Sequence, residues 1–125
     1  MSEEIRLWAV RGATRAGAND PEKVIEATQE LMRELMDRNG IRPDQMVSCI
    51  FTSTHDLNAE FPAAAARKIG LEAVPLLCAQ EIDVPGSMRS VIRVLVHYYG
   101  PPDRSPSHTY LGEAQELRSD LRAAQ

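Results

Sequence analysis

The sequence predicts an α+β fold, with a mixed β-sheet that two main helices cover in part. Five short apolar segments have strand patterns and two segments have helical spacing, in the order β-α-β-α-β-β-β. Glycine and proline clusters separate these segments. Since 125 residues suit one hydrophobic core, we predict a single domain over residues 1–125.

In the first half of the chain, two predicted strands flank a long helix. Residues 5–10 alternate as in a strand, which ends at Arg11-Gly12-Ala13-Thr14. Asp20-Pro21-Glu22 starts a helix, because its aspartate can cap and its proline is tolerated at the first helical position. Helical spacing continues until Asn39-Gly40 ends the helix, and residues 46–51 form the second strand.

The second half of the chain contains a short helix and three predicted strands. Phe61-Pro62 opens a helix over residues 63–69, which Gly70 ends. Pro75 places the next strand, residues 74–78, at a sheet edge or at a strand beginning. The remaining segments are a strand over 91–97, a loop over 100–107, a short strand over 108–111 and a brief helical or irregular stretch over 113–118.

Composition and charge argue against several classes of protein. The apolar share of 43% and the charged share of 26% are ordinary for a soluble globular protein. The net charge of −4 argues against general nucleic-acid binding, which needs a basic face for phosphate contacts. No apolar run is long enough to span a bilayer, and the acidic N-terminus is unlike a signal sequence. We therefore expect a cytoplasmic protein that binds neither nucleic acid nor membrane.

Motifs for metals, cofactors and nucleophiles do not occur in the sequence. Cys49 and Cys78 form no CxxC pair and are expected to be buried free thiols. The three histidines lack metal-ligand spacing and no Walker or dinucleotide fingerprint is found, so we expect neither a metal nor a cofactor. Ser53, His55 and Asp56 are almost adjacent, which is not how a catalytic triad is assembled.

Two charged residues interrupt the apolar stretch over residues 76–96. Arg93 lies inside a β-branched run, and strand alternation puts it on one face with Val91, Leu95 and His97. Glu81 closes the preceding apolar run, twelve positions earlier. Arg93 could be an ordinary solvated strand residue, could pair with the glutamate, or could share a substrate with it. The spacing leaves these alternatives open.

Two short helices can cover part of such a sheet. An apolar face that stays uncovered favours burial between subunits, so we expect a homo-oligomer.

Six ordered blocks of the sequence resemble the small monofunctional chorismate mutases of the Bacillus type. The resemblance covers nearly the whole chain with compatible gaps. The blocks are Arg11-Gly12-Ala13-Thr14, Phe61-Pro62-Ala63 with Arg67, Cys78-x-Gln80-Glu81-x-Asp83-Val84, Ile92-Arg93-Val94, His108-x-Tyr110-Leu111 and Leu117-Arg118-x-Asp120-Leu121.

The resemblance implies a ferredoxin-like, chorismate mutase-like fold that assembles as a homotrimer. The trimer forms a pseudo-α/β barrel with three clefts at the subunit interfaces. Such enzymes convert chorismate to prephenate, in the branch of the shikimate pathway that leads to phenylalanine and tyrosine. The reaction is a unimolecular Claisen rearrangement, which uses no cofactor or metal.

The resemblance also assigns the central residues of the site. Arg93 would stabilise the negative charge that develops on the ether oxygen of chorismate. Arg11 and Tyr110 would hold the enolpyruvyl carboxylate. Glu81, helped by Cys78, would accept a hydrogen bond from the ring hydroxyl and act as an orienting and electrostatic group.

Other matched positions would bind the rest of the substrate. Arg67 and Arg118 would meet the ring carboxylate, and residues 113–125 would form a lid that orders over the ligand. Phe61, Ala63 and Leu117 would supply apolar walls. The sequence departs from the family at Ala64, where some relatives carry lysine, and at Leu77, where a threonine can line the site; both departures put the affinity in doubt.

Two alternatives belong to other classes of function. A non-catalytic trimer on the same scaffold could bind or sense a small dicarboxylate through Arg11, Arg67 and Arg93. Glu81 argues against it, because a dianion-binding pocket has little use for a carboxylate. A purely structural oligomer would leave both Arg93 and Glu81 unexplained.

Overall fold

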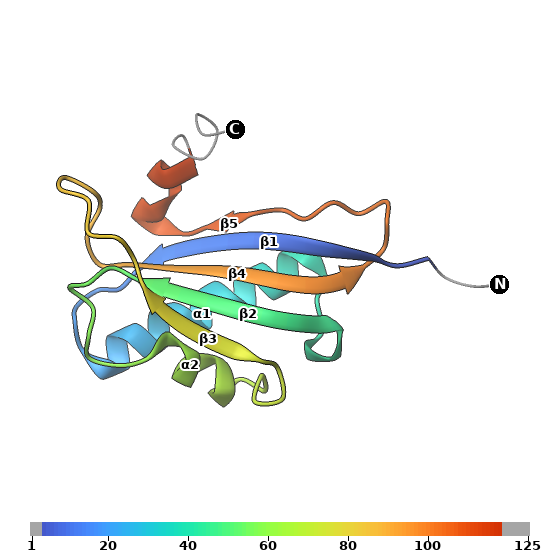
Figure 1. Ribbon diagram of the computed structural model, residues 1–125, viewed down its shortest axis with the longest axis horizontal. Helices are drawn as coiled ribbons and strands as arrows, with labels where there is room; N and C mark the ends of the chain where they lie inside the picture. Colours follow the sequence, from blue (N-terminus) through green and yellow to red (C-terminus); the bar gives the residue numbers. More distant parts are fainter. Residues whose placement is uncertain (1–3, 119–125) are drawn as a thin grey trace.

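Five strands form one mixed sheet in the order β3-β2-β4-β1-β5 in the computed structural model, which describes residues 4–118 (Figure 1). Strand β4 is antiparallel to both β1 and β2, whereas β3 and β5 run parallel to their neighbours. The strands are β1 (Arg6–Arg15), β2 (Met46–Ser53), β3 (Leu76–Gln80), β4 (Val91–Gly100) and β5 (Thr109–Tyr110). The sheet is mixed, as predicted, and β3 lies at its edge, one of the two positions that Pro75 indicated.

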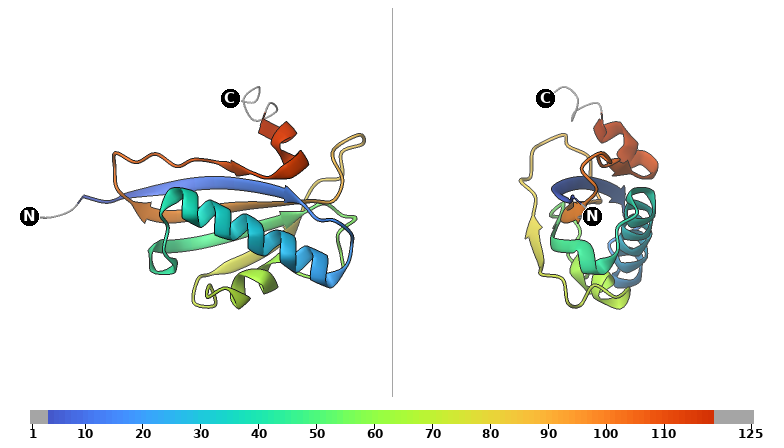
Figure 2. Two further views of the ribbon diagram at one scale, coloured as in Figure 1. Left: turned by 180° about the vertical axis from the view of Figure 1, so that it is seen from behind. Right: turned by 90° about the vertical axis from the view of Figure 1, so that its right-hand side faces the viewer.

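Two helices, α1 (Pro21–Asn39) and α2 (Pro62–Lys68), lie on the same side of the sheet (Figure 2). Asp20 caps α1, since its carboxylate accepts hydrogen bonds from the backbone N–H groups of Glu22 and Lys23 at 3.1 and 3.3 Å. Gly40 ends α1 with a φ of 61°, which a glycine adopts without strain. Two short 3-10 helices also occur, η1 (Pro43–Gln45) and η2 (Gly112–Glu116). The α+β class predicted from the sequence is confirmed.

Side chains along β4 alternate between a buried face and a half-buried face of the sheet, as predicted for Arg93. Ile92, Val94 and Val96 are at most 3% exposed and face the layer that contains the helices. Arg93, Leu95 and His97 are half-buried on the opposite face. The hydrophobic core therefore lies between the sheet and the helices, and Arg93 lies on the other side of the sheet.

Several strand boundaries differ from the prediction, most clearly those of β1, β3 and β4. Strand β1 continues through residues 11–15, because β4 and β5 both pair with this part of it. Gly12 permits this close packing because it has no side chain. A Cβ at this position would lie only 3.0–3.1 Å from two leucine side chains of α1 and from the backbone carbonyl oxygen of Thr109 in β5. Strand β4 extends to residue 100, three residues beyond the prediction, and β3 is shifted to begin after Pro75.

The face opposite the helices exposes several large apolar side chains. Leu7 and Tyr99 are cross-strand partners there and are 50% and 44% exposed, and Leu77 on β3 is 60% exposed. We call this side of the sheet the open face.

Within residues 4–118, no helix is both long and apolar enough to cross a membrane.

Candidate active site

Arg93 and Glu81 form an ion pair on the open face. The guanidinium Nε of Arg93 lies 2.9 Å from Oε2 of Glu81. Glu81 follows the end of β3, and its backbone N–H donates to the carbonyl of Ser53, so the β2–β3 ladder holds it in place. The glutamate side chain is 17% exposed and the arginine 43%. Of the alternatives left open by the sequence, pairing of the two residues is the one observed.

The ion pair leaves its outer atoms free. Both the Nε of Arg93 and the hydroxyl of Thr52 donate to Oε2 of Glu81, at 2.9 and 2.7 Å. Within residues 4–118, no hydrogen bond involves Oε1 of Glu81 or the two terminal nitrogens of Arg93. A ligand on the open face could therefore meet an acceptor and a cationic fork held next to each other.

Arg11 and Tyr110 lie close to this pair along the strand register. Ala13 of β1 is the cross-strand partner of Arg93 on one side and of Tyr110 on the other. Arg11 is two residues before Ala13, so its side chain is on the same face, and its guanidinium makes no hydrogen bond or ion pair within the described chain. Tyr110 is 7% exposed and packs with Ala13 and Leu117.

His108, the residue before β5, is hydrogen-bonded to Arg11. Its Nδ1 accepts the backbone N–H of Arg11 at 3.1 Å. Burial lowers the pKa of His108 below 6.5, and the positive charges of Arg11 and Arg118 lower it further. The neutral imidazole can therefore act as the hydrogen-bond acceptor.

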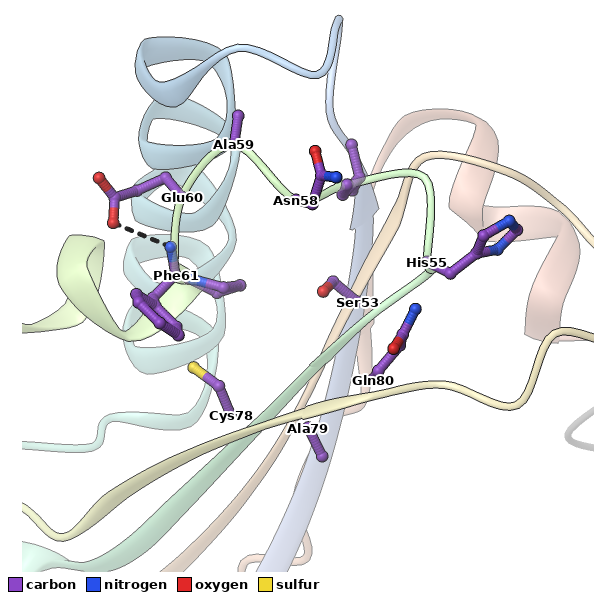
Figure 3. A pocket seen from close by; sticks show the side chains of 11 residues that line it. Ser53, His55, Asn58, Ala59, Glu60, Phe61, Cys78, Ala79 and Gln80 are labelled. Atoms are coloured by element: carbon purple, nitrogen blue, oxygen red, sulfur yellow. Dashed lines mark hydrogen bonds between the residues drawn. The ribbon is translucent and has the colours of Figure 1, made fainter.

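Phe61 and Cys78 line a different hollow, on the other side of β3. A cavity of about 380 Å³ lies between the loop that follows β2 and the edge strand, and Ser53, His55 and Gln80 also line it (Figure 3). Cys78 and Gln80 point into this hollow, whereas Ala79 between them points away (Figure 3). Glu81 is on the side of Ala79 by strand alternation. One copy of the chain thus presents Cys78 and Glu81 on opposite sides of β3.

The remaining predicted residues follow the same division. Leu117 packs near Tyr110, and Arg118 is exposed near His108. Ala64 and Arg67 lie on α2, half-buried and exposed respectively, while Ala63 is buried in the main core. Leu77 is on the open face. We call residues 11, 81, 93, 110, 117 and 118 the Arg93 group, and residues 61, 63, 64, 67 and 78 the Phe61 group.

The two cysteines are free thiols in different surroundings. Burial raises the pKa of Cys49 to about 12, and the neighbouring Cys78 adds to the effect. Cys49 is therefore a protonated core residue. Cys78 is half-buried at the hollow, which differs from the fully buried position expected from the sequence.

Sequence reasoning missed Thr52, which contacts the central ion pair. It belongs to a polar run that carries no motif, and its place depends on the pairing of Thr52 with Arg93 across β2 and β4. Strand alternation could have found it once that register was known.

No group of three or more histidine, cysteine or acidic residues within residues 4–118 is arranged to hold a metal ion. Asp120 and Leu121 of the last sequence block, and the predicted lid beyond residue 118, lie outside the described residues.

Comparisons with known proteins agree on one family. A family model described as chorismate mutase type I matches residues 7–121. The chorismate mutase AroH of Thermus thermophilus is 46% identical over 119 residues, which cover 93% of this chain and 97% of that protein. The chorismate mutase AroH of Bacillus subtilis (strain 168) is 34% identical over 117 residues, 92% of each chain.

A solved structure supports the same relationship at the level of the fold. The chorismate mutase of Clostridium thermocellum superposes with a TM-score of 0.84 and is 42% identical, covering 88% of this chain and 99% of its own. These comparisons give no support to a non-catalytic dicarboxylate-binding protein.

Proposed function

Because this chain belongs to the chorismate mutase type I family, we propose that it isomerises chorismate to prephenate. It is an isomerase of aromatic amino acid biosynthesis, as its resemblance to the Bacillus-type enzymes implied. The observation that carries this conclusion is the family match over residues 7–121, which spans both the Arg93 group and the Phe61 group.

The proposed mechanism depends on orientation and on one fixed cation. Chorismate carries two carboxylates, and its rearrangement needs the enolpyruvyl chain folded over the ring, so a site that holds this conformer lowers the barrier. Breaking the ether bond leaves partial negative charge on the oxygen. The free terminal nitrogens of Arg93 are suited to meet that oxygen, and they stabilise the transition state more than the ground state.

The other members of the Arg93 group position the substrate in this proposal. The guanidinium of Arg11, which has no partner within residues 4–118, binds the enolpyruvyl carboxylate together with the Tyr110 hydroxyl. Oε1 of Glu81 accepts the hydrogen bond of the ring hydroxyl. Glu81 is an orienting group here, because the reaction needs no proton transfer.

The Phe61 group completes the site from a neighbouring subunit. Within one chain the two groups lie on different sides of β3, so a second copy must bring them together if they contact the same ligand. We propose a homotrimer in which Arg67 and Arg118 meet the ring carboxylate. Phe61, Ala63 and Leu117 supply the apolar walls, and Cys78 helps Glu81 at the ring hydroxyl. The apolar side chains exposed on the open face support this association, since burying them removes leucine and tyrosine from water. The proposal also keeps a single domain over residues 1–125, a lid formed by about residues 113–125, and a cytoplasmic location.

The test is direct turnover of chorismate by the purified protein. With a chelator present and no additive, the protein should consume chorismate and form prephenate, measured by product chromatography. Arg93→Ala should lower kcat by about a hundred- to a thousandfold, the scale for loss of one transition-state donor. Consumption no faster than the uncatalysed rearrangement would refute the proposed function.

A further inference from the structure

The hydroxyl of Thr52 is the one neutral donor to the central ion pair among the described residues. Its Oγ1 lies 2.7 Å from Oε2 of Glu81, the same oxygen that Arg93 Nε contacts at 2.9 Å. Thr52 is half-buried on the interior strand β2, and it faces Arg93 on the neighbouring strand β4. Its backbone is therefore fixed by the sheet on both sides, because β3 pairs with it as well.

A glutamate side chain that is held by one arginine alone could still adopt several rotamers. Side chains of this length lose substantial rotamer freedom when they are ordered, and a single contact fixes the carboxylate poorly. A second donor on Oε2 restricts rotation of the carboxylate. It also leaves Oε1 and the Arg93 terminal nitrogens without a protein partner within residues 4–118.

We infer that Thr52 is a positioning residue for the reaction: its hydroxyl holds Glu81 Oε2, so that Glu81 Oε1 and the Arg93 fork stay aimed at the substrate. The inference rests on the proposed function, because it assigns Thr52 a part in that same site. A hydroxyl suits this task because it donates a strong hydrogen bond to a carboxylate without adding charge. A further cation there would weaken the attraction between Glu81 and Arg93.

Substitution of Thr52 separates the hydroxyl from the shape of the side chain. Thr52→Val keeps the β-branched form that suits a strand and removes the donor, and Thr52→Ser keeps the donor. We expect Thr52→Val to lower kcat about tenfold with a smaller change in KM, and Thr52→Ser to stay close to the wild type. Thr28→Val is the matched control, since that buried hydroxyl makes a 2.7 Å bond to a helix carbonyl away from the site.

A double substitution tests whether Thr52 acts through Glu81. If it does, adding Thr52→Val to Glu81→Ala should lower kcat no further, because the group that Thr52 holds is already gone. Losses that multiply would contradict the inference. Should Thr52→Val fail to fold in a thermal unfolding measurement, Thr52→Ala and Thr52→Ser provide the same comparison.

Arg93→Ala, assayed in parallel, separates this inference from the proposed function. If Arg93→Ala loses turnover while Thr52→Val and Thr52→Ala match the wild type, the role of Thr52 is refuted and the enzyme assignment stands. If neither the wild type nor any variant exceeds the uncatalysed rate, the proposed function itself is wrong.

Discussion

At the scale of single residues, Arg93 has two separable tasks. Its Nε binds Glu81, and its terminal nitrogens remain free within residues 4–118. A guanidinium can do both because its donors form a rigid planar fork. A lysine has one nitrogen, which could pair with Glu81 or face the substrate but could not hold both in this geometry. The site therefore specifies arginine by shape as well as by charge.

His108 makes stability depend on pH on the acid side. Its pKa in the folded protein lies below the value of 6.5 expected when unfolded, so folding favours the neutral form. The stabilisation is complete above about pH 6.5 and is lost as the pH falls through the lowered pKa. We expect the melting temperature of the wild type to fall over this acid range more steeply than that of His108→Asn.

The asparagine variant is a suitable comparison because its side-chain oxygen can still accept the Arg11 N–H and does not titrate. Thermal unfolding of both proteins at a series of pH values measures the difference. Parallel curves for the two proteins would show that His108 contributes nothing to the acid dependence.

The residue roles could be predicted from the sequence in part. The face of Arg93 followed from strand alternation, and its partner Glu81 was one of the alternatives considered. Thr52 could not be predicted, because its contact depends on a cross-strand register that a single sequence does not specify. The roles given to the predicted site residues remain predictions.

At the scale of elements, Asn39 connects the end of α1 to the segment that leads into β5. The sequence indicated Asn39 as part of the signal that ends the helix. In the structure, Asn39 also anchors the segment around Ser107. Its Oδ1 accepts the Ser107 N–H at 2.6 Å, and its Nδ2 donates to the Ser107 and Leu35 carbonyls at 3.0 and 2.8 Å. This contact holds a proline-rich loop against the body of the protein, next to His108 and Tyr110.

Asn39→Ala should therefore destabilise the protein by about 1–3 kcal/mol, because the backbone groups of Ser107 lose their partners in a partly buried place. Urea unfolding measures the change. Asn39→Asp keeps the acceptor for the Ser107 N–H and should fall between the wild type and the alanine variant. An alanine variant with the wild-type midpoint would contradict the anchoring role.

Element order and type were predicted well, and element ends less well. The cap at Asp20 and the stop at Gly40 follow from local chemistry that the sequence displays, whereas Pro75 left two positions open for β3, a sheet edge or a strand beginning. Strand β1 was predicted too short, because its last residues are held by β4 and β5, which lie about eighty or more residues later in the chain. Tertiary pairing determines such ends.

At the scale of the whole molecule, the Arg93 group and the Phe61 group lie on different sides of β3. We therefore predict that each active site takes one group from each of two subunits. Mass measurement in solution should find three chains in each particle. Arg93→Ala and Phe61→Asp each disable one of the two groups, the second by placing a negative charge where a dianion must bind. When the two inactive variants are unfolded together and refolded, mixed trimers should regain part of the wild-type activity.

The matched control for this experiment is each variant refolded alone, which should stay inactive. Recovery occurs because some clefts then receive Phe61 from one chain and Arg93 from another. A mixture no more active than its components would mean that both groups act within a single chain, and a monomeric mass would refute the trimer.

The central position of β4 also limits when the protein can fold during its synthesis. Strand β1 is complete after residue 15, yet both of its hydrogen-bonded neighbours, β4 and β5, lie beyond residue 90. During synthesis, the backbone of β1 therefore cannot form its sheet hydrogen bonds until most of the chain has left the ribosome. Strands β2 and β3 can pair with each other earlier. Chaperones that shield nascent strands would thus act mainly on the amino-terminal segment.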